Sequence, residues 1–104
     1  MPDLQVKIGS AIFKNPVWVA SGTFGNGEEL EGLTDITKLG AVIMKGATLD
    51  PREGNPFSRI VETPSGILNC IGLQNPGLDI VLKEKARFLA EKGVAAILIT
   101  RTRE

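Results

Sequence analysis

The sequence predicts an α/β protein built on a parallel β-sheet. Three short and almost continuously apolar runs, residues 16–21, 41–46 and 94–100, have the pattern of strands buried on both faces. Two segments with apolar residues at helical spacing separate these runs. Elements that alternate in this way form consecutive βα units, and right-handed crossovers then place their strands side by side in parallel.

Composition limits the chain to one domain, residues 1–104, of ordinary globular character, with 42% hydrophobic residues. Twelve basic and twelve acidic side chains give zero net charge, which argues against nucleic acid and anionic membrane surfaces as partners. The longest apolar run, Val94–Ile99, is far shorter than the roughly 20 residues of a membrane span. The amino terminus lacks the pattern of a secretory leader, so we expect a cytoplasmic location.

The first elements are a hairpin and a strand. Apolar residues on both sides of Gly9 and Ser10 predict a short β-hairpin over residues 4–14. The first buried strand, residues 16–21, then stops at Gly22, and the sequence "SGTFGNG" predicts a loop.

A helix is predicted next. Leu30, Leu33, Ile36 and Leu39 recur at helical spacing, glutamates begin the segment, and Gly40 follows where a left-handed cap is needed. The second strand, residues 41–46, follows this helix and carries a lysine, Lys45, at its carboxyl end.

Residues 47–58 carry two prolines and both charge signs, which predicts a long loop. Short strands are expected at 59–63 and 66–73, on either side of a turn. A second helix follows, with Asn75 as N-cap and Pro76 as its first residue, and it ends at Gly93. Its inward-facing positions are predicted to be Leu78, Val81, Leu82, Ala86, Leu89 and Ala90.

Two architectures satisfy this order of elements. One is an open three-stranded sheet. The other is a β/α (TIM) barrel, which is favoured because most of the unusual residues follow the carboxyl ends of the strands. A complete barrel needs about 250 residues, so the chain would be the amino-terminal portion, an N-terminal hairpin and about three βα units.

Three places carry candidate chemistry. Ser21 and Gly22 offer backbone N–H groups and a hydroxyl to a flat ligand, although spacing alone favours a simple glycine turn. Lys45 either provides a fixed positive charge for an anionic ligand or extends its ammonium to solvent at the rim of the sheet. The amides of Asn69, Gln74 and Asn75 suit an amide-like heterocycle, with helix capping as the alternative for Asn75.

The chain has no histidine and a single cysteine, Cys70, which therefore cannot form an internal disulfide. No cationic neighbour in the sequence predicts a reactive thiolate, so Cys70 is interpreted as a small packing residue. Arg52 and Glu53 are interpreted as solvated loop residues and are not assigned a catalytic role.

The stretches "KNPVWVASGTFGNGEE" and "LGAVIMKGATLDPREGNPFSRIVETPSGILNCIGLQNPG" resemble the dihydroorotate dehydrogenase family, most closely its cytosolic NAD-linked branch. The resemblance implies FMN-dependent oxidation of dihydroorotate to orotate in pyrimidine (UMP) biosynthesis. It also implies a homodimer and a partner subunit that carries FAD and an iron–sulfur cluster.

Matched position by position, the resemblance implies two sets of binding residues. The FMN contacts would be Ala20, Ser21, Gly22, Lys45 and Gly46. The substrate contacts would be Lys45, Asn69, Cys70, Ile71, Gly72 and Leu73.

No catalytic residue is assigned, because the family's catalytic base is a cysteine on a later loop that does not match Cys70 and is expected beyond Glu104. We therefore expect the 104-residue chain alone to be inactive. The alternatives are a non-catalytic module that binds a flavin or a pyrimidine, and a remnant that another chain completes.

Overall fold

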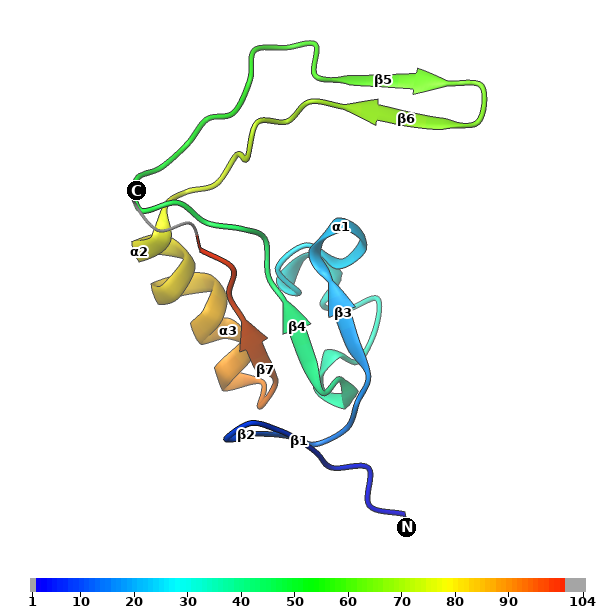
Figure 1. Ribbon diagram of the computed structural model, residues 1–104, viewed down its shortest axis with the longest axis vertical. Coiled ribbons are helices and arrows are strands. Elements are labelled where there is room, and N and C mark those ends of the chain that lie inside the picture. Colours follow the sequence, from blue (N-terminus) through cyan, green and yellow to red (C-terminus); the bar gives the residue numbers. More distant parts are fainter. Residues whose placement is uncertain (1, 101–104) are drawn as a thin grey trace.

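A three-stranded parallel sheet forms the centre of the molecule (Figure 1). The computed structural model describes residues 2–100, and the sheet has the order β3 (Trp18–Ala20), β4 (Ala41–Ile43) and β7 (Ala95–Ile97). Val42 of β4 pairs with Val19 on one side and with Ala96 on the other. The predicted parallel sheet is therefore confirmed, with strands shorter than the apolar runs.

The central strand carries the core. Ala41, Val42 and Met44 are fully buried, because β4 has a neighbouring strand on each side. β3 is an edge strand of this sheet, and Val17 just before it is 59% exposed. The prediction that residues 16–21 are buried on both faces is therefore wrong.

The predicted amino-terminal hairpin is confirmed. β1 (Val6–Ile8) pairs antiparallel with β2 (Ala11–Phe13), and Gly9 adopts the positive φ that a tight hairpin turn needs. The hairpin lies at the end of the sheet where the parallel strands begin (Figure 1). The Phe13 ring packs on Trp18 with centroids 4.6 Å apart, which ties the hairpin to β3.

The predicted helix over residues 28–39 does not form. The segment contains two single 3₁₀ turns, η1 (Glu28–Leu30) and η2 (Ile36–Lys38), and Leu33 between them is 82% exposed. Gly32 has φ of +92°, which breaks a helix. The Asp35 side chain accepts hydrogen bonds from the Thr37 hydroxyl and N–H, which lowers the pKa of that carboxyl and favours a cap over a helix interior.

The second predicted helix is confirmed, with changes at its start and on its buried face. Helical backbone runs from α2 (Leu78–Ile80) through a π-helical segment, η3 (Val81–Ala86), into α3 (Arg87–Glu91). It ends before Gly93, whose φ is +71°.

Two expectations for this helix are wrong. It begins at Leu78 rather than at Pro76, because the Asn75 side chain accepts a hydrogen bond from the N–H of Gly77, the residue just before the helix. Leu82 and Ala90 are exposed, whereas Val81 and Leu89 are buried. The π-helical turn departs from the 3.6-residue period from which the inward positions were predicted.

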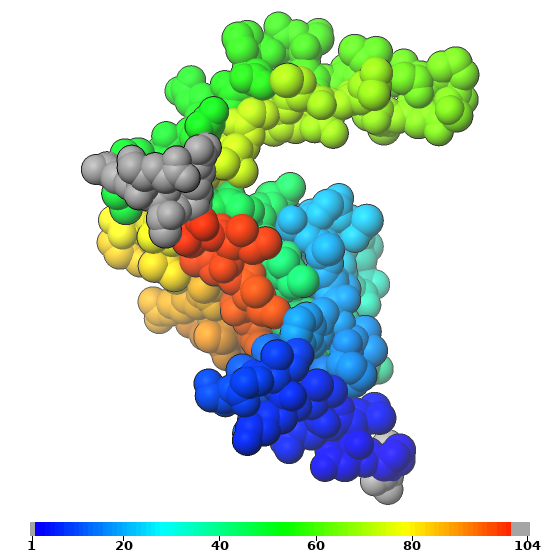
Figure 2. Space-filling view, in the orientation of Figure 1, coloured from blue at the N-terminus to red at the C-terminus, as the bar shows by residue number. Residues whose placement is uncertain are grey.

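A long arm projects from the body of the molecule (Figures 1 and 2). It consists of β5 (Ile60–Thr63) and β6 (Gly66–Asn69), which pair antiparallel as the sequence predicts. The segment that leaves the arm returns beside the loop that leads into it and enters α2 (Figure 1), and Arg52 pairs with Asn75 there. Within residues 2–100, no helix is both long and apolar enough to cross a membrane.

Truncation of Leu89 tests the position of the core. Leu89 is fully buried and belongs to the main apolar cluster, so Leu89→Ala should lower the free energy of unfolding by about 2–5 kcal/mol. Leu33→Ala is the matched control, since this exposed side chain should contribute less than about 0.5 kcal/mol. Urea unfolding followed by circular dichroism measures both. Equal losses would contradict the burial pattern.

The ion pair between Lys85 and Glu28 predicts a change of stability with pH. The hydrogen bond that the Lys85 ammonium donates to the Glu28 carboxylate raises the pKa of Lys85 above its ordinary value of 10.5. The folded-state pKa is higher than the unfolded one, so the stabilisation is complete below pH 10.5 and is lost as pH rises through the folded-state pKa. The melting temperature of wild type should fall over that range more than that of Glu28→Gln.

Candidate functional site

The first candidate residues lie where β3 ends. Ala20 pairs with Ile43, so the residues after Ala20 stand beside those that follow β4. Ser21 and Gly22 lie in a four-residue helix, α1 (Ser21–Phe24), in place of the predicted loop. Ser21 is half-buried and Gly22 is exposed, with no atom within 4 Å of where a Cβ would stand at Gly22. This surface can accommodate the face of a ligand.

Lys45 follows β4 at a point where the strand pairing is irregular. Met44 N–H donates to Ile97 O at 2.9 Å, and Ala47 N–H donates to Ile99 O at 3.0 Å. Between these two hydrogen bonds the chain advances three residues after β4 but only two after β7. The segment after β4 therefore contains one extra residue. An extra residue of this kind forms a β-bulge, which redirects a side chain. The bulge lies at Lys45 and Gly46, and Lys45 is exposed.

A buried amide supports this bulge. The Asn26 side-chain oxygen accepts a hydrogen bond from Lys45 N–H at 2.9 Å, and Asn26 is only 8% exposed. Sequence reasoning interpreted the loop around Asn26 as glycine-rich and did not assign a role to the asparagine. The signal for it is a polar residue between two glycines, Gly25 and Gly27, which both adopt positive φ.

Gly46 and Leu73 are brought together. A Cβ at Gly46 would lie 3.3 Å from the Leu73 Cδ1 atom, so a larger residue at Gly46 would push Leu73 away. Leu73 itself has φ of +57°, an uncommon conformation for leucine. The contact joins one predicted flavin residue to one predicted substrate residue.

The rest of the 70–73 segment is held by the preceding loop. Asn55 N–H donates to Ile71 O at 2.9 Å, and the Asn55 side-chain amide donates to Cys70 O at 3.0 Å. Arg52 Nε donates to Gly72 O at 2.9 Å. Gly72 has φ of +81°, and a Cβ there would lie 2.7 Å from Asn55 Cγ. These contacts fix the backbone of the predicted substrate segment.

Cys70 is not a packing residue, because its side chain is exposed. Asn55 Nδ2 lies 3.1 Å from the Cys70 sulfur. The sequence interpretation of Cys70 as a small packing residue is therefore wrong, since the segment lies along the surface at the base of the arm.

Asn69 lies apart from the other candidates. It is the last residue of β6, pairs with Ile60 in the arm and is exposed. Among the described residues, the structure gives no hydrogen bond between Asn69 and Lys45. The sequence predicts Asn69 in the same site as Lys45, and the structure places it at the end of β6 in the arm. Its role in substrate binding stays a prediction.

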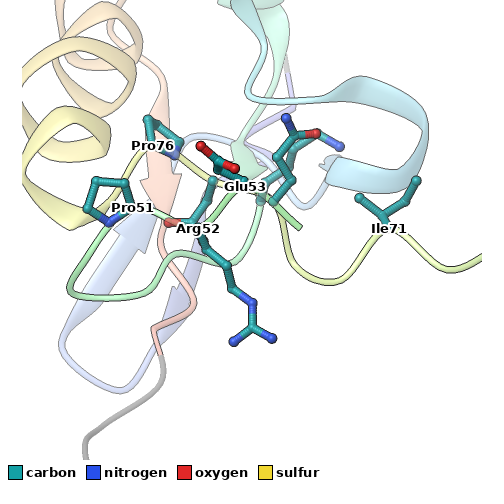
Figure 3. A pocket seen from close by; sticks show the side chains of 8 residues that line it. Pro51, Arg52, Glu53, Ile71 and Pro76 are labelled. Carbon is teal, nitrogen blue, oxygen red and sulfur yellow. The ribbon is translucent and has the colours of Figure 1, made fainter. Parts of the chain in front are cut away.

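A cavity of about 490 Å³ lies between the loop that follows β4 and the segment that follows the arm (Figure 3). Lys45 and Ile71 line it together, and both are predicted substrate contacts. The other lining residues come from the loop and from the start of the helix: Pro51, Arg52, Glu53, Gln74, Asn75 and Pro76. Arg52 and Glu53 therefore lie at the cavity, although the sequence analysis interpreted them as solvated loop residues.

Asn75 is a structural residue. Its side-chain oxygen accepts hydrogen bonds from Thr48 N–H at 3.1 Å and from Gly77 N–H at 3.0 Å, and its amide donates to Leu73 O at 2.9 Å. Asn75 is 7% exposed. Its amide thus joins the loop after β4 to the start of the helix and has little capacity left for a ligand.

Arg59 is a further residue that sequence reasoning missed. Its guanidinium donates to Gln74 Oε1 at 2.8 Å and to Glu53 O at 3.1 Å, and it lies 4.7 Å from the centre of the Phe57 ring. Arg59 therefore connects the two chain segments at the base of the arm. Within residues 2–100, no three His, Cys, Asp or Glu side chains are grouped to hold a metal ion.

The comparisons with known proteins agree on one family. The family model described as dihydroorotate dehydrogenase matches residues 3–103. The chain is 52% identical over 96 residues to the catalytic subunit of dihydroorotate dehydrogenase B (NAD⁺) of Trichlorobacter lovleyi, covering 92% of this chain and 32% of the relative. The subunit of the same name from Desulforamulus reducens is 57% identical over 86 residues, covering 83% of this chain and 28% of the relative.

A third relative, from Bacteroides thetaiotaomicron, has the same name and is 55% identical over 84 residues, which cover 81% of this chain and 28% of the relative. The chain thus spans about a third of the length of these curated relatives. The family model covers nearly the whole chain. The chain belongs to the dihydroorotate dehydrogenase family, whose members are oxidoreductases.

Proposed function

We propose that this chain carries one wall of the flavin and substrate site of a dihydroorotate dehydrogenase that oxidises dihydroorotate to orotate in pyrimidine biosynthesis. One observation carries the proposal. In this member of the family, the segments that follow β3 and β4 meet at one edge of the sheet, and Lys45 and Ile71 line one cavity there. Parallel strands bring ligand-binding loops together at their carboxyl ends.

The proposed architecture is the first part of a β/α barrel. β3, β4 and β7 are adjacent in the sheet in the same order as in the chain, as successive strands of a barrel are. The helix from Leu78 to Glu91 connects β4 to β7 after the arm, which makes one βα unit with a long insertion. The hairpin of β1 and β2 would close the amino-terminal end.

FMN fits the residues at the carboxyl edge. The flavin ring is flat, and Gly22 offers open space beside the half-buried Ser21 and the exposed Ala20. Gly46 leaves no side chain between this surface and Leu73. FMN would be held on these residues and on Lys45, and it would supply the capacity to accept a hydride from C6 of dihydroorotate.

Lys45 supplies the fixed charge in this proposal. Its ammonium would oppose the negative charge that the flavin gains and the carboxylate of the substrate. The segment from Asn69 to Leu73 would bind orotate. Asn55 holds Ile71, Arg52 holds Gly72 and Asn75 holds Leu73 through hydrogen bonds to their carbonyl oxygens. The described residues provide no assigned proton acceptor, and the proposal places the catalytic base on a part of the enzyme that this chain does not contain.

The relatives' names describe a catalytic subunit, which implies a partner. We extend the proposal to a cytoplasmic homodimer that works with a second subunit carrying FAD and an iron–sulfur cluster. That subunit would pass electrons from the reduced FMN to NAD⁺.

Flavin binding tests the role of Lys45. Lys45→Met should weaken FMN binding by roughly tenfold or more, because hydrogen bonds to charged groups are among the strongest in proteins. Quenching of FMN fluorescence on titration with the purified chain measures the affinity. Lys7→Met is the matched control, since this exposed lysine lies on β1 at the opposite end of the sheet. An equal effect of both substitutions would show that FMN responds to the overall charge of the chain and would contradict a specific role of Lys45.

A chimaera tests the activity. Residues 1–93 of this chain, joined to the remaining part of the Trichlorobacter lovleyi relative, should give a protein whose FMN is bleached by dihydroorotate under anaerobic conditions. The isolated chain should show no bleaching. A folded, flavin-loaded chimaera that dihydroorotate does not reduce would contradict the proposed function.

A further inference from the structure

Asn26 is a buried polar residue that the proposed function does not use. Asn26 lies in the turn between α1 and η1, is 8% exposed and accepts the hydrogen bond from Lys45 N–H. The position of Lys45 in the sheet explains why its N–H needs this acceptor.

Lys45 N–H has no strand to pair with. Successive residues of a parallel strand direct their N–H groups alternately to the two neighbouring strands. Met44 N–H is bonded to Ile97 O in β7, so Lys45 N–H points to the side of β3. β3 has already ended at Ala20, where the chain turns into α1. The Asn26 side-chain oxygen occupies the place that a β3 carbonyl would otherwise take.

The loop is built to hold Asn26 there. Gly25 and Gly27 have φ of +60° and +97°, and a Cβ at Gly27 would lie 3.0 Å from Leu89 Cδ2 in the core. A Cβ at Gly25 would lie 2.6 Å from Glu29 Oε1. The Glu29 carboxylate also accepts a hydrogen bond from Asn26 N–H at 3.0 Å. Two left-handed glycines and a carboxylate thus fix the backbone on both sides of the amide.

We propose that Asn26 is a positioning residue for Lys45: its amide oxygen holds the bulge at Lys45 and Gly46 and so fixes the direction of the Lys45 side chain. The part of this statement that concerns the flavin rests on the proposed function. The part that concerns the bulge rests on the contacts alone. The glycines of the loop serve the placement of Asn26, and only Gly22 is left open to a ligand.

Amide hydrogen exchange, read by NMR in the 104-residue chain, tests the contact itself. In wild type, the Lys45 amide should be protected although no strand pairs with it. Asn26→Ala should raise its exchange rate about fivefold relative to Val42, as expected for one lost hydrogen bond. Asn26→Asp keeps an acceptor oxygen and should restore the protection.

Asn15→Ala is the matched control. The Asn15 side chain makes two similar hydrogen bonds, with Val17 N–H at 2.9 Å and Lys38 O at 2.8 Å, at the opposite end of β3. Its loss should leave the exchange rate of the Lys45 amide unchanged relative to Val42. An unprotected Lys45 amide in wild type beside a protected Met44, or an equal rise in Asn15→Ala, would overturn the proposal. The first of these results needs no variant to fold.

A double-mutant cycle on FMN affinity tests whether Asn26 acts through Lys45. Asn26→Ala should weaken binding severalfold in wild type and should have no effect in the Lys45→Met background. Additive losses would overturn a role through Lys45. If neither the chain nor the chimaera binds FMN, the proposed function fails, and the exchange measurement alone decides on the positioning of the bulge.

Discussion

The pairing of β4 between β3 and β7 is the interaction on which the rest of the structure depends. Val42 and Met44 are fully buried, because both sheet neighbours and the helix from Leu78 to Glu91 pack against this strand. The candidate flavin residues take their places from the ends of β3 and β4. A strand that is fully enclosed can hold a charged residue at its end in a fixed position, since its backbone has no freedom to shift.

The sequence predicted the parallel sheet, but it did not predict segments in which side chains bond to the backbone. Continuous apolar runs identify β4 and β7, but only β4, which has a strand on each side, is buried as such a run predicts; Ala96 of the edge strand β7 is exposed. The helix predicted over residues 28–39 failed because Asp35 caps the Thr37 backbone and Gly32 adopts positive φ. Leu33 fits the helical period and is nevertheless exposed, so apolar spacing without compatible backbone chemistry was insufficient.

Site residues that stand out by their charge could be predicted from the sequence. Site residues whose role depends on hydrogen bonds to distant parts of the chain could not. Lys45 stands out because a lysine at the end of an apolar run is unusual. Asn26 and Asn55 do not stand out, because their partners are 19 and 15 residues away and no periodicity indicates such pairs. Asn69 shows the opposite case. Its residue type suits a ligand, but its position depends on where the arm lies.

The position of Asn69 depends on the arm, which is held only at its base. Cross-strand pairs share a face of a hairpin, so Val61 and Leu68 lie on one face, and both are more than half exposed. Ile60, Ile67 and Asn69 share the other face. A two-stranded hairpin is at best marginally stable alone, so the position of Asn69 is set at the base, where Cys70 N–H donates to Arg59 O. A contact that covers the face of Val61 and Leu68 would fix the arm and, with it, the direction in which Asn69 points.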